Sequence, residues 1–258
     1  STITTDNDAL FYTWSDSDTQ KAQFVLDGSV AEGHGKALAQ FYAHHSTLSA
    51  TDSSLTNAML TDHASGASST VTLNRSTWAM KANSDITHLT ANHSLVDLRG
   101  SGQFNTLTVA GNYAGNNSTL VMNTALGDDD SQTDKLVVSG DTSGITNVLI
   151  HNAGGSGAKT LNGIEVIEVG GQSVGEFVQS GRIVAGSYEY FLGRGNGNSS
   201  SRDNWYLTNI MTPIDPTDPI DPIDPVDPIV PVPKPVGPIG PSTYRPETGS
   251  YLGNLAAA

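Results

Sequence analysis

The sequence predicts an all-β fold, in which a solenoid of short strands is closed by a β-rich cap and followed by a proline-rich linker. Short runs alternate apolar and polar residues between Gly, Asn, Ser and Asp, a pattern typical of half-buried strands. A five-residue template recurs at intervals of 18 and 24 residues. All twelve prolines fall between Pro213 and Pro246, so the chain changes character sharply near residue 212.

The composition excludes several classes of function. Hydrophobic residues make up 36% of the 258 residues and charged residues 15%, which suits a thin core rather than a globular enzyme. The net charge of −14, without any basic run, argues against nucleic acid and anionic membrane surfaces as partners. Because cysteine is absent, disulfides and thiolate metal sites are excluded. The chain opens at Ser1 without a signal peptide or spanning apolar run, and we expect it to be a piece of something longer.

The template consists of a serine followed by apolar residues two and four places later. It occurs in Ser76-Thr-Trp-Ala-Met80, Ser94-Leu-Val-Asp-Leu98 and Ser118-Thr-Leu-Val-Met122. A repeat near 20 residues that carries short strands favours a solenoid. A β-sandwich remains the alternative, since its strands also recur at short intervals. The stretch 36–44 is compatible with a short helix or a strand.

Longer strands are expected in the second half, over 135–138, 147–150, 164–169, 182–185, 187–192 and 205–207. Aromatic residues also gather late in this region, and each adds a large buried area. We therefore expect the second half to be the most stable part of the chain.

The proline-rich segment has a regular spacing. From Pro213 to Pro228 a proline recurs at every third position, with Asp residues between them. Polyproline II has three residues per turn, so the prolines would lie along one ridge of a semi-rigid spacer. A ligand for a polyproline-binding domain is the weaker alternative, because the repeat lacks a basic anchor.

Residues 105–209 resemble the autochaperone region of autotransporter (type V secretion) passengers of the pertactin-like and AIDA-like group. The resemblance rests on Phe104–Val109, Gly111-Asn-Tyr113, Gly115–Leu120, Ser131–Val138, Gly140–Gly144, Gly163–Ile167 and Tyr188-Glu-Tyr190. The blocks at 76–80 and 94–98 resemble the last rungs of these passengers, and 244–251 resembles the junction to the translocator barrel. About 180 of the 258 residues are covered, in the family's order.

The resemblance implies a right-handed parallel β-helix displayed at the surface of a Gram-negative bacterium, or secreted after cleavage. It divides the chain into passenger rungs (1–110), an autochaperone cap (111–209), a Pro/Asp-rich linker (210–243) and the start of the barrel junction (244–258). The cap is expected to fold first outside the cell and to act as a template for each emerging rung. The expected buried folding core is Leu136, Val138, Ile150, Val166, Tyr188, Tyr190, Trp205 and Leu207, and the expected turn glycines are Gly140, Gly144 and Gly163.

Motifs for chemistry are weak, and no catalytic, cofactor-binding or metal-ligating residue is predicted. The histidines lack metal-ligand spacing; they are His34, His44, His45, His63, His88, His93 and His151. The acidic run 128–130 lacks calcium-loop spacing, and Gly154-Gly-Ser156-Gly lacks the second glycine of a nucleophile elbow. Glu165 and Glu168, three residues apart in one strand, are expected to project to opposite faces and so not to act as a pair.

The predicted function is therefore structural: the chain nucleates passenger folding during outer-membrane translocation and supports adhesion or virulence. An adhesin or self-association surface is the alternative, with a glycan-active β-helix enzyme as a distant third. The expected partner is the protein's own translocator barrel, with a host-cell receptor or neighbouring passengers as further candidates and nucleic acid excluded. No cofactor is expected.

Overall fold

The computed structural model describes residues 1–15, 19–100, 102–196 and 202–209. The chain divides into two compact units, 1–211 and 212–258, and every described residue belongs to the first. The linker predicted at 210–243 and the barrel junction predicted at 244–258 lie outside the described residues. Within the described part, no helix is long and apolar enough to span a membrane.

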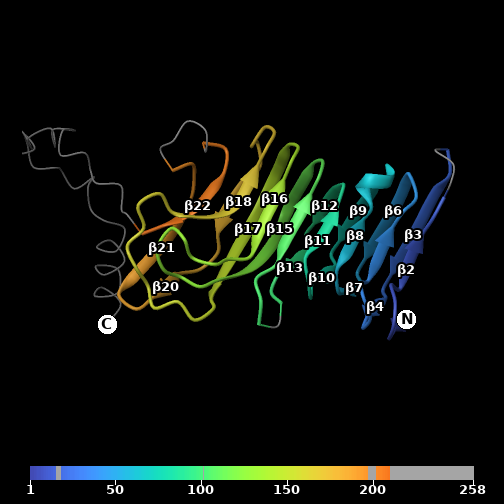
Figure 1. Ribbon diagram of the computed structural model, residues 1–258, viewed down its shortest axis with the longest axis horizontal. Helices are drawn as coiled ribbons and strands as arrows, with labels where there is room; N and C mark the ends of the chain where they lie inside the picture. The colour runs from blue at the N-terminus through green and yellow to red at the C-terminus, as the bar shows by residue number, and fades with distance from the viewer. Residues whose placement is uncertain (16–18, 101, 197–201, 210–258) are drawn as a thin grey trace, which may run out of the picture. The chain divides into compact units, whose positions relative to one another are not determined.

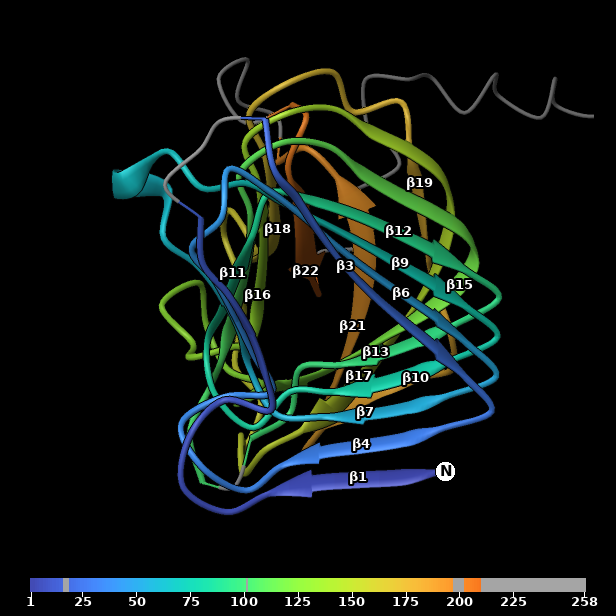
Figure 2. The same cartoon turned by 90° about the vertical axis from the view of Figure 1, so that its right-hand side faces the viewer.

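The described unit is built from strands stacked in three columns (Figures 1 and 2). One column contains β3 (Lys21–Asp27), β6 (His45–Thr51), β9 (Ser69–Asn74) and β12 (His88–Asn92). A second contains β1 (Thr2–Thr5), β4 (Val30–Gly33), β7 (Ser54–Thr56), β10 (Thr77–Ala79) and β13 (Leu95–Asp97). The third contains β2 (Phe11–Thr13), β5 (Ala39–Phe41), β8 (Met59–Thr61), β11 (Ser84–Ile86), β14 (Thr106–Val109), β16 (Lys135–Val138) and β18 (Ile164–Val169).

The first two columns merge in two long strands, β15 (Tyr113–Thr124) and β17 (Thr142–Asn152). The start of β15 pairs with β12 and its later part with β13, always in parallel. The short strand β19 (Glu176–Gln179) then extends the parallel ladder from β17. A parallel β-helix is thereby confirmed, and a β-sandwich is excluded for this unit because each strand pairs with the equivalent strand of the next turn.

The predicted repeat is confirmed by the register of these strands. Trp78 lies opposite Val96, and Val96 lies opposite Leu120, so the template residues stack in one column inside the core. The stretch 36–44 contributes the strand β5 rather than a helix, and the described part contains only one 3₁₀ turn, η1 (His63–Ser65). The ladder runs without a break past residue 110, where Leu107 pairs with Leu136; the domain boundary placed there stays a prediction.

The serines of the template form a hydrogen-bonded ladder along one corner of the stack. The backbone N–H of Ser76 donates to Ser94 Oγ at 3.0 Å, and that of Ser94 donates to Ser118 Oγ at 3.4 Å. Ser29 and Ser53 extend the ladder towards the N-terminus with the same bond at 3.0 Å. Each hydroxyl from Ser29 to Ser94 also donates to the carbonyl two residues earlier, at 2.7–2.9 Å, so these buried hydroxyls are satisfied.

The residue before each of these serines turns the corner with a left-handed backbone. Gly28 has φ of 52°, and Asp52, Arg75, His93 and Asn117 have φ between 47° and 53°. A left-handed conformation costs roughly 1–2 kcal/mol for a residue with a Cβ. The guanidinium of Arg75 holds Asp52 of the preceding turn through two hydrogen bonds of 2.8 and 2.7 Å, which helps to offset that cost.

An asparagine ladder runs beside the serine ladder. The Nδ2 group of Asn116 donates to Asn92 Oδ1, and that of Asn92 donates to Asn74 Oδ1, each at 2.7 Å. Each of these asparagines stands two residues before a ladder serine. The triplets Asn74-Arg-Ser76, Asn92-His-Ser94 and Asn116-Asn-Ser118 are therefore corner motifs of this fold.

Candidate folding cap

The stack changes from parallel to antiparallel at its C-terminal end. The strand β18 is the last parallel strand of its column, and β22 (Trp205–Thr208) lies antiparallel beside it, with Ile164 opposite Leu207. The strands β21 (Tyr188–Arg194) and β20 (Ile183–Ala185) follow, again antiparallel. Because an uncovered strand edge invites further pairing, the group β20–β21–β22 closes this column of the solenoid (Figure 1).

Seven of the eight predicted core residues are buried. Leu136, Val138, Val166, Tyr190 and Leu207 have 0% of their surface exposed, Trp205 has 5% and Ile150 has 6%. Tyr188 is the exception, with 39% exposed, so the expectation that its side chain is buried was wrong. It begins β21 opposite Ala185, and its ring covers the backbone of Gly157 at the surface instead of entering the core. The folding role of these residues stays a prediction.

Three aromatic rings connect the parallel stack to the cap. The rings of Tyr113 and Phe177 stack with centroids 5.9 Å apart, and Phe177 meets Trp205 edge to face at 5.4 Å. The guanidinium of Arg194 lies 4.8 Å from the centre of the Trp205 ring. Burial raises the pKa of Tyr113 to about 12, although its hydroxyl keeps a 2.9 Å hydrogen bond with Thr146 Oγ1. The sequence patterns missed Phe177, because the adjacent Val178 is also apolar and the run Glu176-Phe-Val-Gln179 shows no alternation.

The hydroxyl of Tyr190 fastens β21 to two loops. It lies 2.7 Å from the carbonyl oxygen of Gly127 and 3.0 Å from that of Ala158, and it accepts the N–H of Ala158 at 3.0 Å. Gly127 belongs to the loop between β15 and β16, and Ala158 to the loop between β17 and β18. One buried side chain therefore ties the cap to two successive turns of the solenoid.

Asn209 fastens the end of β22 to the same part of the loop. Its Oδ1 accepts the N–H of Thr160 at 2.9 Å, while its own N–H donates to Thr160 Oγ1 at 3.1 Å. Its Nδ2 group donates to the carbonyl oxygen of Ala158. The loop after β17 is thus held by side chains from both β21 and the end of β22.

Two aspartates join the loops to one another. Asp129 accepts the backbone N–H groups of residues 161–163 at 2.8–2.9 Å, and these bonds outweigh partial burial and lower the pKa of its carboxyl group. Asp134, fully buried, accepts the N–H groups of Asn105 and Asn123 at 2.7 and 2.6 Å. Desolvation dominates there and raises the pKa of the Asp134 carboxyl group. The middle aspartate of the run 128–130 is therefore occupied by backbone amides.

A polar network covers the outside of the same closure. Lys135 Nζ lies 2.5 Å from a carboxylate oxygen of Glu165 and 3.0 Å from one of Glu168. The expectation that these glutamates face opposite sides was wrong, because a β-bulge between Glu165 and Ile167 turns two successive residues, Val166 and Ile167, inwards. Burial opposes ionisation of Glu165, but its bonds with Lys135, Tyr206 and Asn204 prevail and lower its pKa.

The three predicted turn glycines serve two purposes. Gly144 and Gly163 have φ of 78° and 93°, in the left-handed region that favours glycine. Gly140 is not among the residues with positive φ; a Cβ there would lie 2.3 Å from Asn112 Oδ1 and 2.6 Å from the carbonyl oxygen of Gly111. Gly140 therefore allows two neighbouring turns to approach closely.

The described residues contain no group of three or more His, Asp or Glu side chains that could hold a metal ion. Two of the histidines contact residues of a neighbouring turn. His88 Nδ1 accepts the backbone N–H of Asn112 at 3.0 Å, and His63 Nε2 lies 2.9 Å from Asp85.

Comparison with known proteins agrees with this geometry. Residues 84–192 match the family Autochaperone Domain Type 1. The chain is 51% identical to the Escherichia coli protein YdeU over 158 residues, which are 60% of this chain and 31% of YdeU. It is 37% identical to the autotransporter adhesin AIDA-I of Escherichia coli over 155 residues, which are 60% of this chain and 10% of AIDA-I.

The fold also has a solved counterpart. The crystal structure of the Haemophilus influenzae Hap adhesin superposes with a TM-score of 0.50 and 24% identity, over 74% of this chain and 20% of the other. The chain thus corresponds to a small part of these longer proteins. The family match over 84–192 and the similarity to AIDA-I support an autotransporter passenger autochaperone region in this part of the chain.

Proposed function

We propose that the cap nucleates folding of the β-helix during translocation across the outer membrane of a Gram-negative bacterium. The observation that supports this is the antiparallel closure by β20–β21–β22, which ends the third column, while its side chains hold two loops of the stack. At the other end, no described strand covers β1 and β2 on their outer edges. In the third column, where β22 already covers β18, a further rung can therefore be added only at the N-terminal side.

The energetic reason lies in the cost of the first rung. A parallel rung formed alone orders many residues before it gains contacts, because its pairing partners are distant in sequence. The connection between antiparallel β21 and β22 (195–204) is shorter than the 18 to 24 residues that separate parallel partners such as Trp78, Val96 and Leu120. The two strands enclose the buried side chains of Tyr190, Trp205 and Leu207. The cap therefore gains burial for little loop-closure entropy, and it requires no catalytic residue.

A refolding experiment tests the nucleation role in the isolated chain. Trp205→Ala removes a buried aromatic from the cap, and Trp78→Ala is the matched control, since Trp78 is fully buried in an upstream rung. If the cap forms first, Trp205→Ala slows refolding, whereas Trp78→Ala mainly accelerates unfolding, both followed by far-ultraviolet circular dichroism. Slower refolding in Trp78→Ala alone would contradict the proposal.

Surface display tests the same role in the full-length protein. Deleting residues 183–209 removes the closure and should abolish display of a protease-resistant passenger. The control deletes residues 54–76, which is one repeat in register because Ser53 then takes the place of Ser76. That variant should be displayed with a passenger one turn shorter. Normal display after the first deletion would refute the idea.

A second candidate function is adhesion or self-association. It is favoured by the regular polar columns on the outer face, including the asparagine ladder, which suit weak multivalent contacts. AIDA-I is named as an adhesin. Bacteria that display only this fragment should aggregate or bind host cells if the fragment itself is adhesive. A lack of both would restrict the fragment to the folding role.

A further inference from the structure

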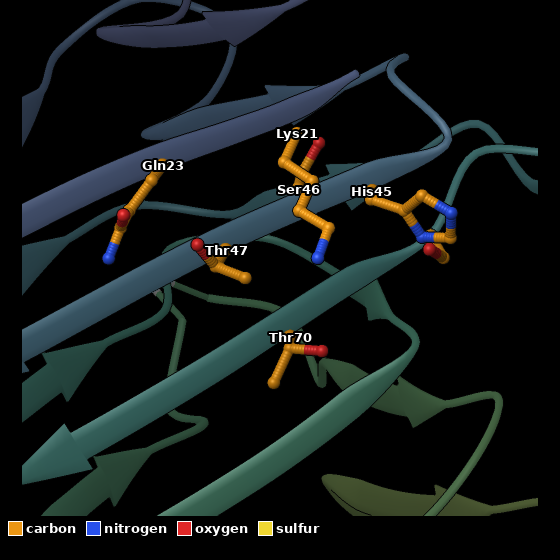
Figure 3. A pocket seen from close by; sticks show the side chains of 7 residues that line it. Lys21, Gln23, His45, Ser46, Thr47 and Thr70 are labelled. Carbon is orange, nitrogen blue, oxygen red and sulfur yellow. The ribbon is translucent and has the colours of Figure 1, made fainter. Parts of the chain in front are cut away.

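A hollow of about 370 Å³ opens on the outer face of β3, β6 and β9, near the N-terminal ends of these strands (Figure 3). Its lining consists of Lys21, Gln23, His45, Ser46, Thr47, Ser68 and Thr70. It lies at some distance along the stack from the cap and upstream of residues 84–192. A ligand site in this hollow is therefore independent of the proposed folding function.

The strand register explains why these side chains meet. Lys21 lies opposite His45, while Gln23, Thr47 and Thr70 are successive partners in the neighbouring row. Strands lie about 4.8 Å apart and alternate residues about 6.7 Å apart along a strand, so the two rows span roughly 10 by 7 Å. Figure 3 shows the Lys21 side chain extending across β6, with its ammonium group between the side chains of Thr47 and His45.

The chemistry of this lining differs from that of the chain as a whole. The sequence has 26 acidic residues against 12 Lys and Arg, yet no lining residue is acidic. Lys36, Arg75, Arg99 and Lys135 each pair with a carboxylate, whereas no described carboxylate lies within 4.0 Å of Lys21. Among the described residues, the hollow thus offers a cation without a carboxylate partner beside hydroxyl, amide and imidazole groups.

We propose that this hollow binds an anionic sugar unit, a saccharide that carries a carboxylate or sulfate group. The Lys21 ammonium would hold the anionic group, and His45 would donate beside it. Gln23, Thr47 and Thr70 would exchange hydrogen bonds with the ring hydroxyls, because each can both donate and accept. The volume lies within the range of small-molecule sites, and the two rows match the length of one or two sugar rings.

Titration of the full chain tests the ligand class. The probes are a sulfated heparin disaccharide, a hyaluronan tetrasaccharide that carries only carboxylates, neutral cellobiose and inorganic sulfate. We expect at least one acidic sugar to bind 10-fold or more tightly than cellobiose or inorganic sulfate, and to bind more weakly as salt is raised. Binding of the hyaluronan tetrasaccharide would show that a carboxylate suffices, whereas binding of the heparin disaccharide alone would assign the site to sulfate. Equal affinity for inorganic sulfate, or no binding of either acidic sugar, would overturn the proposal.

Matched variants test the location. Lys21→Gln and His45→Gln should each weaken binding of the acidic sugar at least 5-fold without lowering the melting temperature, since both side chains are exposed. Lys36→Gln is the control, because Lys36 pairs with Asp8 outside the hollow and carries the same charge. Amide chemical shifts of Thr47 and Thr70 should move on titration. An equal loss of affinity in Lys36→Gln would show that only the net charge of the chain matters, and it would contradict the proposed site.

Discussion

The ring of Phe177 meets the ring of Trp205 edge to face, with centroids 5.4 Å apart. This contact joins the last parallel strand of one sheet to the antiparallel strand that closes the other. It lies under the guanidinium of Arg194, which covers the indole from outside. The two sheets of the cap are therefore coupled through one aromatic pair as well as through the backbone.

Alanine substitutions at this pair should be strongly non-additive. Trp205→Ala and Phe177→Ala should each destabilise the chain by about 3–5 kcal/mol, because each leaves a large cavity. The double variant should lose less than the sum, with a coupling of about 0.5–1.5 kcal/mol beyond burial. Urea denaturation measures all three. Strict additivity would show that the rings do not stabilise one another.

Trp205→Phe provides the control for this cycle. The indole N–H of Trp205 is buried without a hydrogen-bond partner in the described structure. Phenylalanine retains an aromatic edge for Phe177 and removes the unpaired donor, so its cost should be well below that of alanine. A Phe variant as unstable as Ala would argue against the ring contact.

Tyr190→Phe should reveal the value of the hydroxyl that ties the loops. The change leaves the carbonyl of Gly127 and the N–H of Ala158 without this partner in a buried setting. A loss of about 1–3 kcal/mol is expected, together with faster amide hydrogen exchange in both loops. Tyr188→Phe is the matched control, since Tyr188 is partly exposed, and it should leave both measurements unchanged.

Asp129→Asn and Asp134→Asn should change the acid stability in opposite directions. The folded pKa of Asp129 is lowered, so its contribution is present above the unfolded value of about 3.9 and is lost as pH falls through the folded pKa. The folded pKa of Asp134 is raised, so its contribution is fully present below about 3.9 and is lost as pH rises through the folded pKa.

Melting temperatures between pH 3 and pH 7 test this contrast. The stability difference between wild type and Asp129→Asn should shrink as pH falls. Over the same interval, the wild type should become more stable relative to Asp134→Asn as pH falls. Parallel trends in the two variants would contradict the assigned pKa directions.

Ser94→Ala should weaken the stack in its middle. The hydroxyl of Ser94 accepts the N–H of Ser76 and donates to the carbonyl of Asn92, and it is 4% exposed. Without this hydroxyl, the buried N–H of Ser76 has no acceptor, so a loss of about 1–3 kcal/mol in the free energy of unfolding is expected in thermal or urea unfolding. Ser65→Ala, which removes a local bond at an exposed turn, should cost almost nothing.

The sequence predicted the solenoid because a period-two alternation and a recurring serine survive in the rungs from 76 to 122. The template did not detect the two earlier rungs that begin at Ser29 and Ser53. Four residues after these serines stand Gly33 and Asn57, where the template requires an apolar residue. Asn57 is buried there with its amide fully used, donating to the carbonyls of Gly33 and Gly35 and accepting the N–H of Ala58. A polar residue can thus occupy a core position when the backbone satisfies it.

The candidate cap was less predictable for reasons of local geometry. Alternation placed seven core residues inside, but the β-bulge in β18 reversed the expected relation of Glu165 and Glu168. Tyr188 has the right parity in its strand, yet the strand begins beyond the edge of the core. The contacts of Asp129 and Asp134 join residues 11 to 34 positions apart, and no local pattern encodes them.

Where the serine and asparagine ladders run side by side, over residues 74–118, each rung carries two kinds of connector. A rung facing the N-terminus presents a serine hydroxyl that awaits a backbone N–H and, two residues earlier, an asparagine amide that awaits a carbonyl oxygen. An incoming turn shifted by one residue would engage neither connector, and both would lie unpaired against it. The two ladders therefore penalise a misaligned neighbouring turn at each rung that carries them.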